Sequence, residues 1–164
     1  MEILSHRVMD HDCLSIASEQ IYILEQFRDE VVQPSLDNIN LQLAKLKTDT
    51  TDLSIFLFDD FDALRNITIQ GFLISLQSLW ERGFRSMLKA FGDKANNSVI
   101  SRNSKVAKWS TDENGLQTLF ATVIGIEIRL FPSYKDLSFL QMLANAIRHG
   151  DGRFDLPFVC SPTQ

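Results

Sequence analysis

The chain has few of the residues that build disulfide frameworks, zinc sites or membrane spans. Its 164 residues include two cysteines, four prolines and seven glycines. Cys13 and Cys160 lie far apart and form no CxxC pair, which argues against a disulfide framework or a cysteine-based zinc site and favours a reducing, cytoplasmic location. No apolar run is long enough to span a membrane, and no secretory signal pattern follows Met1, so we expect no membrane association.

The chain also lacks a basic excess. Its net charge of −5 argues against broad, nonspecific attraction to nucleic acid. The charge is uneven, because between Arg82 and Lys108 seven basic residues stand against Asp93 alone, so this stretch carries +6. It is either a solvated surface that balances an acidic body or an electropositive surface that guides a phosphate backbone.

What the sequence does contain is helical periodicity along most of its length, which predicts an all-α helical bundle of about five helices. The length suits one domain over residues 1–164. A first amphipathic segment runs over 14–27 to Pro34, which is expected to end or kink it. A short a/d seam covers 36–46, and a connection at 48–52 leads into one long helix from 53 to 91.

The second half of the chain contains a break and two further helices. Residues 92–111 are rich in Asn and Ser and predict an irregular basic insertion. Helical spacing resumes over 116–130 and is ended by Pro132. Ser133 and Asp136 predict a capping-box start for the last helix, and Gly150 is placed for the left-handed conformation that ends it.

The polar residues at the end of this last helix are the chain's best candidates for chemistry. Gln141, Asn145 and His149 step by four and so share one helical face, with Arg148 beside them. A ligand the size of a nucleobase or a phosphate could meet an imidazole, a guanidinium and two amides there, so Gln141 is predicted to bind substrate. A histidine can move protons near neutral pH, and a guanidinium can hold a phosphate. In metal-independent RNA cleavage, His149 would act as general base or acid, Arg148 would brace the phosphate, and Asn145 would orient the imidazole or bind phosphate. Alternatively, Arg and His simply end a helix, as they often do.

The same residues carry a resemblance. Asn145-x-x-x-His149 followed by Gly150-Asp151-Gly152 resembles the signature of the HEPN superfamily, all-α domains that often contain an Arg-Asn-three-residues-His motif. The resemblance implies a bundle of four to five helices and a homodimer in which two motifs form one cleft. It also implies a ribonuclease or RNA-binding role in bacterial toxin–antitoxin or antiviral systems, with an antitoxin or another protein as partner. The motif covers some ten residues.

One position departs from the family pattern. Where the motif has its arginine, this chain has Ala144, which cannot bind phosphate. Either Arg148 takes over that task, or the site is incomplete. HEPN-like domains without the full motif resemble noncatalytic modules that dimerise or bind nucleic acid. The alternative function of this chain is therefore that of a catalytically inactive HEPN-like module for dimerisation or protein interaction.

Some HEPN-like sites include a charged residue from an earlier helix, so the resemblance implies that three residues of the long helix line the substrate cleft: Glu81, Arg82 and Arg85. Glu81 and Arg85 are four apart, so an exposed salt bridge between them is the alternative interpretation. The acidic groups at 10–12 and 59–62 are better explained as caps and helix starts than as ligands. We therefore expect neither a metal nor a cofactor.

Overall fold

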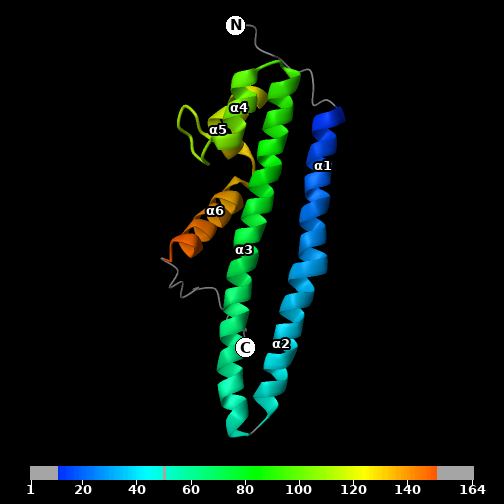
Figure 1. Cartoon of the computed structure of the whole chain (residues 1–164), viewed down its shortest axis with the longest axis vertical. Coiled ribbons are helices and arrows are strands. Elements are labelled where there is room, and N and C mark those ends of the chain that lie inside the picture. The colour runs from blue at the N-terminus through cyan, green and yellow to red at the C-terminus, as the bar shows by residue number, and fades with distance from the viewer. Residues whose placement is uncertain (1–10, 50, 151–164) are drawn as a thin grey trace.

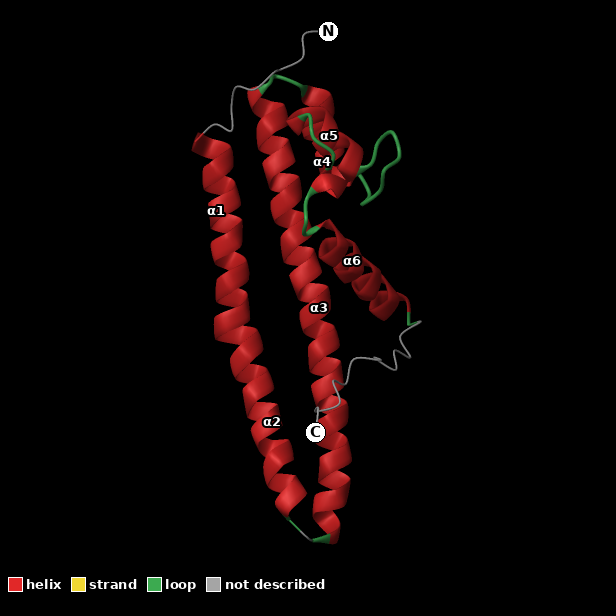
Figure 2. Ribbon diagram, turned by 180° about the vertical axis from the view of Figure 1, so that it is seen from behind, coloured by secondary structure: helices red, strands yellow, loops and turns green. Residues whose placement is uncertain are grey.

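The computed structural model describes residues 11–49 and 51–150, and these form helices without any strand, so the all-α class is confirmed (Figure 2). The elements are α1 (His11–Gln26), the π-helix η1 (Phe27–Val32), α2 (Gln33–Thr48), α3 (Asp52–Lys94), α4 (Ser98–Val106), α5 (Leu116–Ile124), the 3₁₀-helix η2 (Ile128–Leu130) and α6 (Tyr134–His149). Residues 151–164, including Asp151 and Cys160, lie outside the described part, as does Asp10.

Pro34 was predicted to end or kink the first segment, and the structure shows that the segment does not end there. Helix α1 continues through η1 into α2, whose first turn contains the proline. A proline lacks the backbone N–H of a regular helix, and a turn of π-helix in front of it accommodates the missing bond. The hydroxyl of Ser35 donates to the carbonyl of Val31 at 2.6 Å, which satisfies one acceptor of that wider turn.

Two antiparallel rods form the frame of the molecule. The rod made of α1, η1 and α2 runs beside α3 (Figure 1). The predicted connection over 48–52 joins the two rods, and the chain reverses its direction there. Ile39 and Leu43 of the predicted a/d seam are buried, and helix α2 makes its main contacts with α3. The long helix predicted over 53–91 is confirmed as α3, which at 1.5 Å per residue is about 65 Å long.

The buried core lies at the end of α3 that carries α4 and α5 (Figure 1). Leu88 and Leu116 are fully buried there. Rings from different segments extend this core: Trp80 meets Trp109 with centroids 4.7 Å apart, and Phe84 stacks on Phe120 at 5.3 Å. Helices α4, α5 and α6 therefore pack along one half of α3, whereas the other half, which we call the distal half (residues 52–75), lies beside α2.

The predicted irregular insertion contains a helix, so the sequence prediction is wrong over Ser98–Val106. Asn97 is the N-cap of helix α4. Its side-chain Oδ1 accepts hydrogen bonds from the backbone N–H groups of Val99 and Ile100. Its close packing depends on Gly92, because a Cβ there would lie 2.6 Å from the backbone nitrogen of Ser101. The polar composition misled the sequence prediction, since these Asn and Ser residues cap and pack a short helix.

Replacing Asn97 with alanine is expected to lower the free energy of unfolding by about 1 kcal/mol, because two N–H groups at the start of α4 lose their acceptor. Urea unfolding followed by circular dichroism measures this loss. Asn114, an exposed asparagine in the loop before α5, gives the matched control, since Asn114→Ala removes no cap. Equal midpoints for the two variants would contradict the capping role.

Helix α5 differs from prediction at its C-terminal end, and α6 differs from prediction at its N-terminal cap. The run predicted to be helical over 116–130 stops at Ile124, because Gly125 adopts a left-handed φ of 78° that ends the helix. Ser133 precedes α6, yet its side chain makes no capping hydrogen bond, so the predicted capping box is wrong. Gly150 ends α6 with a φ of 74°, which confirms its predicted role. Among the described residues, no helix is apolar enough over a sufficient length to cross a bilayer.

Candidate functional site

Arg148 lies in the last turn of α6, and its guanidinium contacts two residues in the middle of α3. Its Nη2 donates to Oε1 of Gln77 at 2.5 Å and to Oγ of Ser78 at 3.1 Å. Because Arg148 follows Gln77 by 71 positions and Ser78 by 70, this contact depends on how α6 packs against α3. Both acceptors are neutral, so they hold the guanidinium in place without cancelling its charge.

Gln77 is the centre of this network. Its side chain is about 1% exposed, and its Nε2 donates to Glu81 at 2.5 Å and to Gln141 at 2.7 Å, while its Oε1 accepts from Arg148. Every polar group of the buried amide is thereby satisfied. The sequence prediction missed Gln77 and Ser78, for which the available signal was a pair of polar residues between Leu76 and Leu79 in an apolar part of α3.

Glu81 and Arg85 form the predicted ion pair, but they are not exposed. Their side chains are only 21% and 23% exposed, and Arg85 Nη1 also donates to the backbone carbonyl of Ser104 at 3.0 Å. Arg85 therefore ties α4 to α3, and its charge is matched by Glu81. The alternative interpretation, an exposed salt bridge, is wrong about the exposure of the pair.

Five residues of this network and Arg82 line a groove of about 370 Å³. The five are Gln77, Ser78, Glu81, Arg85 and Arg148. Arg82 is exposed and makes no hydrogen bond or ion pair with another described residue. Within the described chain, the groove thus presents two guanidinium groups, from Arg82 and Arg148, that no carboxylate neutralises. Guanidinium groups bind phosphate oxygens through paired N–H donors, so this is an anion-binding arrangement.

The other residues of the predicted motif lie beside the groove. Asn145 Oδ1 accepts a long contact of 3.5 Å from Arg148 Nη1. His149 is exposed, does not line the groove, and makes no side-chain hydrogen bond with another described residue. Ala144 is fully buried. The position that departs from the family motif therefore faces the interior of the molecule.

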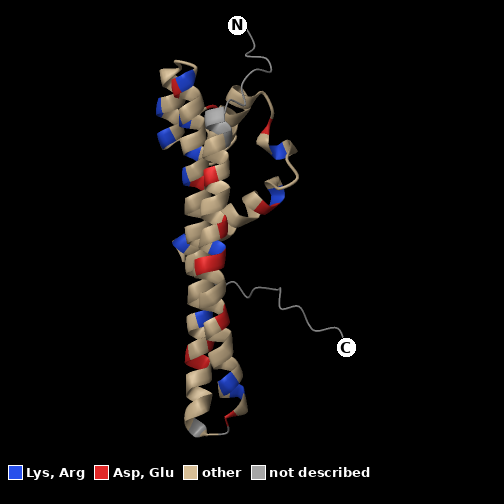
Figure 3. Ribbon diagram, turned by 90° about the vertical axis from the view of Figure 1, so that its right-hand side faces the viewer, with Lys and Arg blue, Asp and Glu red and all other residues tan. Residues whose placement is uncertain are grey.

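The basic stretch from Arg82 to Lys108 begins at this groove and continues along the end of α3 into α4, where Figure 3 shows Lys and Arg gathered. The Lys89 ammonium donates to Asp93, and this hydrogen bond holds the pKa of the Asp93 carboxyl below its usual range. Arg102 and Lys105 on α4 are exposed. A phosphate chain leaving the groove in this direction would meet further positive charge.

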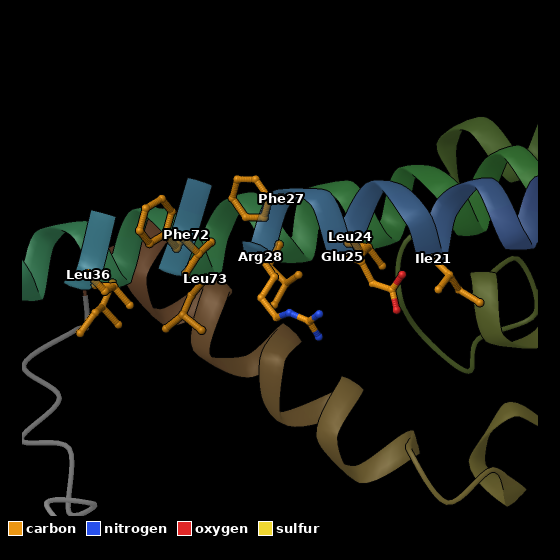
Figure 4. A pocket seen from close by; sticks show the side chains of 11 residues that line it. Ile21, Leu24, Glu25, Phe27, Arg28, Leu36, Phe72 and Leu73 are labelled. Atoms are coloured by element: carbon orange, nitrogen blue, oxygen red, sulfur yellow. The ribbon is translucent and has the colours of Figure 1, made fainter. Parts of the chain in front are cut away.

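A second hollow, of about 420 Å³, lies between the first rod and α3, and its lining is mostly apolar (Figure 4). Leu24, Leu36 and Leu73 point into it, and Phe27 packs edge-on against Phe72 with centroids 5.9 Å apart. Its lining offers no arrangement of acids, bases and anion-binding groups like that around Arg148. We therefore place the candidate site in the groove beside Arg148.

Neither a metal-binding cluster among the described residues nor a comparison with known proteins identifies what the groove binds. The described residues contain no group of three or more His, Cys, Asp or Glu side chains that could hold a metal ion. No protein-family model, no curated protein and no solved structure matches the chain. The HEPN resemblance consequently rests on the motif residues alone.

Proposed function

We propose that this chain binds RNA in the groove beside Arg148 and cleaves it without a metal ion, as a cytoplasmic HEPN-like ribonuclease of a bacterial toxin–antitoxin or antiviral system. The observation that carries the proposal is the pair of guanidinium groups of Arg82 and Arg148, which no described carboxylate neutralises. A phosphodiester supplies the charge that the groove lacks. The biological setting comes from the resemblance of Asn145 and His149 to the family motif.

In the proposed reaction, the ribose 2′-oxygen attacks the neighbouring phosphorus. The new O2′–P bond forms as the P–O5′ bond breaks, the 2′-hydroxyl gives up its proton, and the 5′-oxygen gains one. His149 accepts the first proton or donates the second, and water completes the other transfer. Arg148 holds the phosphate oxygens as negative charge builds up on them. The products carry a 2′,3′-cyclic phosphate and a 5′-hydroxyl.

Replacing His149 with alanine is expected to lower the cleavage rate by about 10²- to 10⁴-fold, since the proton-transfer group is lost. The affinity for RNA is expected to stay within about twofold, because His149 does not line the groove. Cleavage of end-labelled RNA in EDTA measures the rate, and fluorescence anisotropy at low temperature measures binding. Lys135→Ala, at an exposed position in the first turn of α6, is the control. Unchanged cleavage by His149→Ala would contradict the catalytic role.

A noncatalytic function is the second candidate, and one observation favours it. No described side chain orients the imidazole of His149, and Ala144 supplies no phosphate ligand. A HEPN-like module of this kind would bind RNA or a partner protein such as an antitoxin without cleaving. RNA binding that depends on Arg148, together with no cleavage by the native chain, would select this function over the ribonuclease.

A further inference from the structure

The apolar hollow between the first rod and α3 is open to solvent. Figure 4 shows Leu36 of α2 and Leu73 of α3 directed into it from the two rods. None of the apolar residues that line it is fully buried, and Ile21 of α1 is 58% exposed. Apolar surface in water is unfavourable by roughly 25 cal/mol per Å², so a segment that covered this lining would stabilise the chain.

Helix α6 ends beside this hollow. Arg148, in its last turn, donates to Gln77 and Ser78 of α3. Leu73, which lines the hollow, precedes Gln77 by four positions, so the two residues share one face of α3 and lie about 6 Å apart along its axis. The chain therefore leaves α6 at Gly150 close to one end of the hollow.

The sequence that follows α6 contains an alternating apolar pattern. Beyond the described residues, the run Arg153-Phe154-Asp155-Leu156-Pro157-Phe158 has an apolar ring or alkyl side chain at 154, 156 and 158. Successive side chains of an extended chain point to opposite sides, so this pattern favours an extended segment with one apolar face. The proline disfavours a helix for itself and for the residue before it. We call residues 154–158 the Phe154–Phe158 segment.

The length of this segment suits the hollow. Its four extended steps span about 13 Å. The lining runs from Ile69 to Leu76 on α3, which is about 10 Å of helix, and from Ile21 to Leu36 on the first rod, which is about 20 Å. Residues 151–153 bridge at most about 10 Å, which is enough to bring the segment from the end of α6 to the hollow.

A carboxylate lies at the end of the hollow where the segment would enter. The two rods are antiparallel, and Phe27 of the first rod packs on Phe72 of α3. Glu25, which precedes Phe27 and also lines the hollow, therefore lies toward Leu76. This is the end of the hollow nearer α6, because Leu76 adjoins the α3 residues that contact Arg148.

Glu25 has an unmatched negative charge. It is exposed and makes no hydrogen bond or ion pair with another described residue. The nearby cation, Arg28, is hydrogen-bonded to Asp29 through two nitrogens, at 2.6 and 3.0 Å. Arg153, which directly precedes the apolar segment, supplies the opposite charge.

We propose that the Phe154–Phe158 segment fills the apolar hollow, with its apolar face against the lining and Arg153 paired with Glu25. A tether of three residues holds the segment near the hollow at about millimolar effective concentration, so the segment competes well with external ligands for this surface. The proposal is independent of the proposed ribonuclease, because it involves neither RNA nor the chemistry of His149.

Thiol reactivity of the full chain tests the proposal. In a Cys13→Ser and Cys160→Ser background, Leu156→Cys places a single thiol on the apolar face of the segment, and Asp155→Cys places one on the opposite face. Each rate of reaction with a maleimide is divided by the rate of the same variant in urea. This ratio is expected to be at least about tenfold lower for Leu156→Cys, because its thiol reacts only when the segment leaves the hollow. Equal ratios would refute the proposal and assign the hollow to an external ligand.

A substitution in the lining tests where the segment binds. Leu73→Lys, added to the Leu156→Cys chain, introduces a charge into the hollow and is expected to raise the ratio to that of Asp155→Cys. Leu64→Lys is the matched control, since Leu64 lies on the same helix outside the hollow and is 47% exposed. Protection that survives Leu73→Lys, or is lost equally with Leu64→Lys, would overturn the hollow as the binding surface.

Charge reversal tests the ion pair at an exposed position, where the fold is not at risk. Glu25→Lys is expected to raise the ratio of the Leu156→Cys chain by about two- to threefold, since surface ion pairs contribute little. Adding Arg153→Glu to that chain is expected to restore the original ratio, because the pair is then re-formed with its charges exchanged. Failure of this rescue would contradict the pairing of Arg153 with Glu25.

Discussion

Replacing Arg148 with alanine is expected to lower RNA cleavage by about 10²- to 10³-fold, because the phosphate loses the guanidinium that stabilises its developing charge. Unlike the change at His149, this substitution is also expected to weaken RNA binding. The logarithm of affinity against the logarithm of salt concentration should fall less steeply, by about 0.7 in slope, since one phosphate contact is lost. Anisotropy titrations of single-stranded RNA at several salt concentrations measure this slope.

Two controls separate the charge of Arg148 from its structural contacts. Lys135→Ala removes one positive charge from an exposed site in the first turn of α6 outside the groove, and its effect on cleavage should be small. Arg148→Ala also leaves the buried Oε1 of Gln77 without its donor, which destabilises the fold by about 1–3 kcal/mol. Arg148→Lys keeps the positive charge and is expected to retain part of the binding. Equal losses of binding in Lys135→Ala and Arg148→Ala would contradict the groove as the RNA site.

Placing an arginine at position 144, where the HEPN motif has one, is expected to damage this protein. Ala144 is fully buried, so the side chain introduced by Ala144→Arg would carry an unpaired charge into the packed interior. Uncompensated buried charges destabilise proteins by about 3–5 kcal/mol, which for a chain of this size lowers the melting temperature by on the order of 10 °C. Differential scanning fluorimetry measures this change.

The neighbouring residue provides the control for that experiment. Asn145 is exposed, so Asn145→Arg places the same side chain on the surface one residue further along. Its effect on stability should stay within about 0.5 kcal/mol. If Ala144→Arg melted at the same temperature as the native chain and cleaved RNA faster, position 144 would face a site after all, and the burial argument would fail.

The fold could be predicted from sequence where periodicity is long and unambiguous. The confirmed features include the long helix α3, the connection between α2 and α3, and the end of α6 at Gly150. The errors concern local signals that packing overrides. A polar stretch becomes α4 once Asn97 caps it and Gly92 lets it approach α3, and of the two outcomes predicted for Pro34 the end of the helix does not occur.

The candidate site was accessible from sequence only in part. Arg148 was selected for its place beside Asn145 and His149 on the last helix. Glu81, Arg82 and Arg85 were selected through the HEPN resemblance, and the structure brings all four residues to one groove. Gln77 was missed because a single amide in an apolar helix has no distinctive spacing. Its role exists only through Gln141 and Arg148, which approach it from a helix more than 60 residues away along the chain.

By itself, the sequence determined the long helical segments and which residues share a face within each of them. Those properties depend on a period of 3.6 residues, which is local. The rotation of each helix about its axis relative to its neighbours was decided only by tertiary packing. That rotation buries Ala144, directs Arg148 to Gln77 and leaves Leu64 and Ile67 exposed. The reason is physical: which face of a helix is covered depends on contacts between segments that lie far apart in the chain.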